Sequence, residues 1–100
     1  MFLDDQIVEI AEGYDWTRWS TRELVTYDII QLLHKRFNEI GRENAHFNDI
    51  CVEVKRVKNA LILATKRLEK KGIHLRLTWG EVVSILFPED NAVTKKLQQV

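Results

Sequence analysis

The chain has 100 residues, of which 45% are hydrophobic and 30% charged, and its 15 basic side chains balance its 15 acidic ones. This composition is typical of one globular domain, residues 1–100, whose single core leaves little room for a deep substrate cavity. No apolar run approaches the roughly 20 residues that cross a bilayer, no secretory signal pattern is present and the lone Cys51 has no disulfide partner, so we expect a cytoplasmic protein without a membrane partner.

The zero net charge conceals two unlike halves. Residues 1–54 hold 5 basic and 11 acidic side chains, a net charge of −6, whereas residues 55–100 hold 10 basic and 4 acidic ones, a net charge of +6. Two such halves either fold against each other and cancel, or display opposed surfaces. Only the second arrangement implies a charged partner.

The first predicted element is a short helix over residues 3–12. Its apolar residues recur on one face, and Asp4 and Asp5 stand in its first turn, where carboxylates interact favourably with the helix dipole. Gly13 is predicted to end this helix.

A non-helical joint follows, and its two tryptophans are its unusual feature. Buried in the core, Trp16 and Trp19 would lock the first helix onto the rest of the fold. Exposed beside Arg18, they would have the composition of a binding hot spot. The sequence leaves both interpretations open.

A long second helix is predicted over residues 21–40. Ser20 and Glu23 have the spacing of a capping box, in which the serine side chain caps the first turn. Apolar residues then recur every three or four positions until Gly41, which is predicted to end the helix.

A third helix is predicted over residues 46–71. Its apolar residues alternate spacings of three and four from Phe47 to Leu68, a heptad pattern that favours one continuous helix closed by Gly72. The short preceding loop makes the second and third helices an antiparallel hairpin. The apolar seam can be covered by the second helix or by a second copy of the chain, which would form a homodimer.

The remaining segment is predicted to pack on this hairpin. Residues 73–77 alternate apolar and polar side chains as a strand does, but they lack a pairing segment, so we expect an extended connector. Thr78 and Glu81 repeat the capping-box spacing and open a short helix that stops at Pro88, where a last helix begins. The expected fold is therefore all-α.

Enzymatic and metal-binding chemistry is not indicated. No recognisable catalytic spacing links Cys51 to the three histidines, and a small buried thiol is the expected role of this cysteine. The histidines also lack the spacing of metal ligands, and no two glycines lie close enough for a phosphate loop. We predict neither an enzyme nor a bound metal or cofactor.

Basic side chains crowd into the third helix, where Glu69 is the one acid between residues 55 and 71. Such a cluster can neutralise phosphates, and Asn59 can reach base edges. The alternative is a solvated face neutralised by the acidic N-terminal segment. The candidate contacts for a nucleic acid or an acidic partner are Lys55, Arg56, Lys58, Asn59, Lys66, Arg67, Lys70, Lys71 and Arg76.

Residues 47–72 also resemble a helix-turn-helix or winged-helix unit. Ile50 and the closing run over residues 66–73 match the pattern in which a recognition helix leads into a wing. This resemblance implies DNA binding through the basic helix. The turn of such a motif would fall at Lys55, which lacks the left-handed tolerance of glycine, and the heptad pattern continues through it.

Two functions remain open at this point. The first is a non-enzymatic protein-interaction module, such as a small regulator, inhibitor or assembly factor of a bacterial or viral kind. Its candidate hydrophobic interface consists of Trp16, Trp19, Ile62 and Leu63, the last two lying off the heptad seam. The second is a small nucleic-acid-binding regulator that uses the basic helix, residues 55–71.

Overall fold

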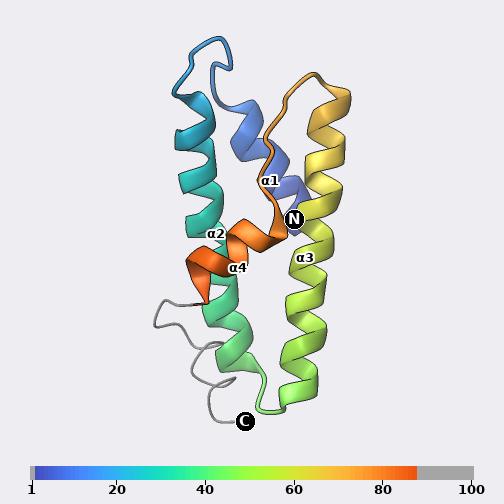
Figure 1. The fold of residues 1–100 in the computed structure, drawn as a ribbon. Helices are drawn as coiled ribbons and strands as arrows, with labels where there is room; N and C mark the ends of the chain where they lie inside the picture. The colour runs from blue at the N-terminus through green and yellow to red at the C-terminus, as the bar shows by residue number, and fades with distance from the viewer. Residues whose placement is uncertain (1, 88–100) are drawn as a thin grey trace.

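The structure is a computed structural model that describes residues 2–87. Within this range the chain forms four α-helices, namely α1 (Leu3–Glu12), α2 (Thr21–Glu43), α3 (Phe47–Lys70) and α4 (Trp79–Leu86), and no strand (Figure 1). The predicted all-α class is therefore confirmed. The last helix predicted from the sequence begins at Pro88 and lies outside the described residues.

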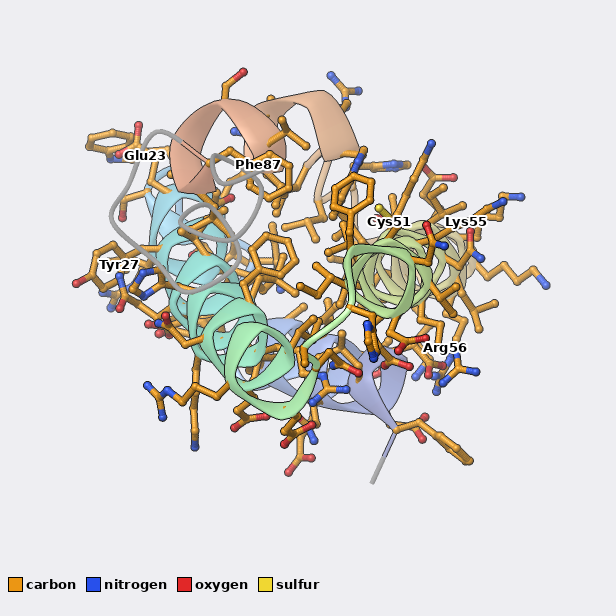
Figure 2. The ribbon with its side chains drawn as sticks, turned by 90° about the horizontal axis from the view of Figure 1, so that it is seen from below. Glu23, Tyr27, Cys51, Lys55, Arg56 and Phe87 are labelled. Atoms are coloured by element: carbon orange, nitrogen blue, oxygen red, sulfur yellow. The ribbon has the colours of Figure 1, made fainter. Side chains whose placement is uncertain are left out.

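The two long helices, α2 and α3, form the predicted antiparallel hairpin (Figure 1). Viewed along its length, α1 lies on one side of the hairpin and α4 on the other (Figure 2). The helix α1 shares a larger interface with α3 than with α2. Three helices therefore surround one side of α3 and leave its other side open.

The heptad seam of α3 is largely buried inside the chain, although Phe47 at its start is 42% exposed. Val57 and Leu61 are each 1% exposed, and Leu68 is fully buried. Burial of each such side chain contributes on the order of 2 kcal/mol to folding. Because other helices of the same molecule cover this seam, it gives no reason to expect a homodimer.

Aromatic packing fastens α4 and the residue after it to α2. The ring of Phe37, fully buried on α2, lies edge-on to Trp79 with ring centroids 6.0 Å apart. The ring of Phe87 also packs against the ring of Phe37, with their centroids 5.5 Å apart. These contacts close the core on the side of the hairpin opposite α1.

The helix α3 runs without interruption through Lys55. A helix-turn-helix unit requires a turn at this position. The helix is therefore continuous, as the heptad pattern predicts, and the backbone lacks the turn of a helix-turn-helix unit.

Gly72 ends α3 as the sequence predicts. It has a φ of 82°, a left-handed conformation that glycine adopts without a side-chain clash. The amide of Gly72 donates to the Glu69 carbonyl at 3.0 Å, and the amide of Ile73 donates to the Leu68 carbonyl at 2.9 Å. This pair of bonds is the Schellman motif.

The capping of α4 and the extended connector are also confirmed. The Thr78 side chain accepts a hydrogen bond from the backbone amide of Glu81 at 3.2 Å, which satisfies one free donor at the start of α4. Residues 73–77 form neither helix nor strand, and Leu75 and Leu77 turn into the core.

The predicted start of α2 at residue 21 is confirmed, but its predicted cap at Ser20 and its predicted end at Gly41 are wrong. Ser20 has a backbone that is already helical, with φ −85° and ψ −6°, and its side chain makes no capping bond. At the other end Gly41 is buried inside the helix, which continues to Glu43. Asn44 is the residue that caps this end, because its side-chain amide donates to the Ile40 carbonyl at 2.9 Å.

Candidate interaction surface

The side of α3 that faces away from the bundle carries both large apolar and cationic side chains. Residues 52, 55, 59, 62, 66 and 70 recur at intervals of three or four, which places them on one face of the helix. The exposed fractions of Val52, Ile62 and Leu63 are 51%, 40% and 50%. We name this surface the α3 outer face, and it consists of Val52, Lys55, Lys58, Asn59, Ile62, Leu63, Lys66 and Lys70.

The open position of this face follows from the arrangement of the helices. Lys55 and Arg56 point outward from α3, away from the other helices (Figure 2). From Val52 to Lys70 the face is about 27 Å long, since an α-helix rises 1.5 Å per residue. It therefore offers a straight, amphipathic surface of several helical turns.

Arg67 and Lys71, two of the predicted contacts, are engaged by α1 inside the molecule. The Arg67 guanidinium donates to Asp4 at 2.8 Å and to Asp5 at 2.7 Å. Lys71 forms an ion pair with Glu12. The acidic N-terminal segment therefore neutralises the C-terminal end of the basic cluster, as the alternative interpretation of the sequence expected.

Arg56 is engaged on α3 itself. Its guanidinium lies 2.7 Å from a carboxylate oxygen of Glu53, and the other oxygen of Glu53 lies 3.3 Å from Arg36 on α2. This shared carboxylate ties α2 to α3. Arg56 is thus held at the edge of the α3 outer face, although it is exposed.

The lysines of the α3 outer face differ from these three residues. Lys55, Lys58, Lys66 and Lys70 are exposed and form no ion pair with another residue in the range 2–87. Their charges are solvated. The positive potential of the basic cluster is therefore concentrated on the outer face.

Arg76, the last predicted basic contact, lies off this face in the connector to α4. It is exposed and has a φ of 56°, the one left-handed non-glycine residue in the described part of the chain. The side chain of Arg22 on α2 donates to the carbonyls of Leu75 at 2.8 Å and Arg76 at 2.9 Å. These bonds hold the connector in place.

The predicted hydrophobic interface divides into separate parts. Trp16 is half-buried against the core and donates from Nε1 to the Ala11 carbonyl at 2.6 Å, so it stabilises the joint after α1. Trp19 is 92% exposed. It precedes α2, whereas Ile62 and Leu63 lie on α3, so the structure does not assemble these residues into one interface.

Sequence reasoning missed several exposed apolar residues, among them Val52, Leu24 and Tyr27. Val52 belongs to the α3 outer face, and Leu24 and Tyr27 lie on α2 with exposed fractions of 54% and 64%. Tyr27 lies on the opposite side of the molecule from Lys55 (Figure 2). Each of the three falls outside the three-and-four apolar spacing of its helix, which is the signal that would have revealed them.

Hollows lie along both edges of the α3 outer face. Towards α4, a groove of about 340 Å³ is lined by Lys55 and Lys58 at its edge and by the Cys51 thiol. Cys51 is exposed, so its predicted burial is wrong. Towards α2, a wider groove of about 720 Å³ borders Asn59 and Leu63. This second groove is lined mainly by polar and charged side chains, Asp4, Glu39 and Glu53 among them, whereas Trp79 and Phe87 in the first groove extend the apolar surface beyond α3 itself.

The described residues contain no group of three or more histidine, cysteine, aspartate or glutamate side chains placed to hold a metal ion. None of the four helices in residues 2–87 has the length and apolar character needed to cross a membrane. Comparisons with protein families, with curated proteins and with solved structures found no match to this chain.

Proposed function

We propose that this chain is a non-enzymatic protein-interaction module, a small cytoplasmic regulator, inhibitor or assembly factor that binds a partner through the α3 outer face. The observation that carries the proposal is the exposure of Val52, Ile62 and Leu63 on a helix whose opposite face is fully buried. Single exposed apolar residues are common on protein surfaces. Several on one helix face, between grooves on both edges, form the kind of patch that marks a binding surface.

The energetics support a protein partner. Covering the remaining surface of a half-exposed aliphatic side chain contributes on the order of 1 kcal/mol, and the α3 outer face offers three such side chains. The solvated lysines interspersed with them add electrostatic selectivity for a partner of opposite charge. This combination of aliphatic side chains and solvated cations favours a partner that offers apolar contact as well as opposite charge.

A nucleic-acid-binding regulator is the second candidate. It is favoured by Lys55, Lys58, Lys66 and Lys70, whose charges no described residue neutralises. Against it, Ile62 and Leu63 lie between the lysine pairs, where a phosphate backbone would meet aliphatic surface. Arginine, the side chain best suited to bidentate base and phosphate contacts, is diverted into ion pairs at Arg56 and Arg67.

Site-specific photo-crosslinking in the native host tests the proposal. A photoreactive amino acid in place of Leu63 on the α3 outer face is compared with one in place of Gln31, an exposed residue of α2. We expect a discrete adduct from position 63 alone that is sensitive to protease and resistant to nuclease. The adduct should disappear in the Ile62→Gln variant, which removes the exposed Ile62 side chain without changing the net charge.

Three outcomes contradict this function. A nuclease-sensitive adduct at position 63 would show that the α3 outer face binds a nucleic acid. Identical adducts from positions 63 and 31 indicate nonspecific contact. A discrete protein adduct that persists in the Ile62→Gln variant shows that the Ile62 side chain does not contribute to binding the partner.

A further inference from the structure

We infer that the partner segment received by the α3 outer face is an acidic amphipathic helix that lies lengthwise along α3. This inference rests on the proposed function and names the chemistry of the partner. It is carried by the exposed apolar residues along α3, by the sign of the charges among them and by the apolar groove towards α4.

The shape of the surface points to a helix. On the outer face the apolar Val52, Ile62 and Leu63 follow one side of a straight helix, a surface that an amphipathic helix can cover lengthwise. The buried face of α3 already packs against helices of this chain in this way. A partner helix of about 18 residues matches the roughly 27 Å length of the face.

The positions of the exposed apolar residues determine where the partner helix must carry apolar residues. Ile62 and Leu63 are adjacent in sequence and project on either side of the line through Asn59 and Lys66. Val52 lies about 15 Å along the helix from Ile62, which corresponds to nearly three turns. A partner helix therefore needs two apolar clusters about ten residues apart on one face.

The charges require acidic flanks on the partner. No aspartate or glutamate occurs in α3 between Glu53 and Glu69, and Lys55, Lys58 and Lys66 within this stretch form no ion pair with another described residue. Carboxylates beside the apolar clusters of the partner would therefore meet Lys55 and Lys66 along the middle of the face and Lys58 on the side towards α4.

The same charges disfavour the other occupants. Two copies of the chain related by twofold symmetry would place the lysines of one outer face against those of the other, with like charges in contact. A nucleic acid or an anionic membrane would satisfy the lysines. It would leave the exposed apolar side chains of Val52, Ile62 and Leu63 without a role.

Three synthetic peptides of 18 residues test the inference with the full chain. All carry leucines at positions 3, 6, 13 and 17, and the flanking positions hold glutamate in the first peptide and lysine in the second. The third is a scrambled form of the first. Fluorescence anisotropy at low and high salt measures the dissociation constant of each. We expect the acidic peptide to bind at least tenfold more tightly than the other two, with affinity falling as salt increases.

Variants separate the two components of the surface. The double variant Lys55→Glu/Lys66→Glu should reverse the preference and favour the lysine peptide. The double variant Ile62→Gln/Leu63→Gln should weaken the acidic peptide at least tenfold at unchanged charge. The matched controls lie outside the α3 outer face and both of its grooves: Arg18→Glu/Arg42→Glu for charge and Leu24→Gln for apolar surface. Both should leave binding unchanged, and a thermal melt of each variant establishes that it is folded.

Equal binding of the acidic and lysine peptides would overturn the inference, as would acidic-peptide binding that is insensitive to the Ile62→Gln/Leu63→Gln change. Tighter binding to duplex DNA, or to vesicles of anionic phospholipid, than to the acidic peptide would assign the face to those ligands. If photo-crosslinking at position 63 identifies a protein partner but the acidic peptide does not bind, the proposed function stands and only the acidic helix is wrong. If both experiments fail, both proposals fall.

Discussion

Arg67 on α3 donates a hydrogen bond of 2.7 Å to Asp5 on α1, and the same guanidinium nitrogen lies 2.8 Å from Asp4. The bond to Asp5, ahead of the contribution from Asp4, raises the pKa of Arg67 above its already high ordinary value. This link joins residues that are 62 positions apart in the sequence. It removes one cation from the binding surface and uses it to hold α1 in place.

We therefore expect Arg67→Met to loosen α1 while retaining the packing of the aliphatic stem. Hydrogen exchange of the α1 amides should accelerate, because the docked state of α1 loses the two Arg67 ion pairs, whereas exchange in the centre of α2 should be unchanged. High salt should accelerate exchange more in the parent protein than in the variant, which keeps only the Lys71–Glu12 pair. Equal exchange in the two proteins at low salt would show that the Arg67 pairs do not fix α1.

The contrast between Leu61 and its neighbour Ile62 tests the assignment of the two faces of α3. Leu61 is 1% exposed, so Leu61→Ala should lower the free energy of unfolding by about 3 kcal/mol. Ile62 is 40% exposed, so Ile62→Gln should change it by no more than about 0.5 kcal/mol. Urea denaturation measures both. A large loss for Ile62→Gln would mean that the residue is needed for folding and would remove it from the interaction surface.

Gly72 should be sensitive to substitution for a backbone reason alone. A Cβ atom at this position would meet nothing within 4 Å, but the φ of 82° is strained for any residue with a side chain. Gly72→Ala should therefore destabilise the fold by about 1 kcal/mol, observed as a lower denaturation midpoint at unchanged slope. Gly80→Ala, inside α4 with no left-handed backbone, serves as the control and should be neutral or stabilising.

Arg22 should be needed to hold the connector between α3 and α4. It donates to the carbonyls of Leu75 at 2.8 Å and Arg76 at 2.9 Å, two hydrogen bonds from a charged group. Replacing it by leucine should cost about 2 kcal/mol. Arg22→Lys should recover only part of this loss, because an ammonium group does not reproduce the forked geometry of the guanidinium. Full recovery with lysine would show that charge, and not geometry, stabilises the connector.

Tyr14 should titrate at unusually high pH. Its hydroxyl donates to the Asp28 carboxylate, and this hydrogen bond, followed by desolvation and the Asp28 charge, raises the pKa of Tyr14 above 10.0. Because the folded state holds this proton more tightly, the stabilisation is complete below the unfolded pKa and is lost as pH rises through the folded value. Phenolate absorbance measures the titration, and Asp28→Asn should lower the pKa of Tyr14. An unchanged titration curve in that variant would exclude Asp28 as the cause.

Much of the fold was determined by the sequence alone, because the deciding interactions are local. The three-and-four spacing of α3 reports a continuous helix directly, and the Gly72 and Thr78 ends follow from backbone conformation and capping within a few residues. The position of Ile62 and Leu63 off the seam left two outcomes open, cover by the C-terminal helices or exposure to a partner, and both residues are exposed.

Local rules failed where tertiary contacts compete with them. A capping box at Ser20 and a stop at Gly41 were both predicted from local signals. The joint before α2 is instead held by a hydrogen bond from Thr21 to the Asp15 carbonyl and by the bond from Tyr14 to Asp28, and α2 continues until Asn44 caps it.

Only the tertiary structure decided which charges and which tryptophan are free. Pairing of Arg67 and Lys71 with α1 depends on how α1 docks, and nothing in the local pattern distinguishes these cations from Lys66 and Lys70. Likewise the path of the joint buries half of Trp16 and leaves Trp19 in solvent, although the two lie three residues apart. The sequence determines which segments are helical because that depends on neighbours along the chain. The binding surface is what remains after the helices have covered one another.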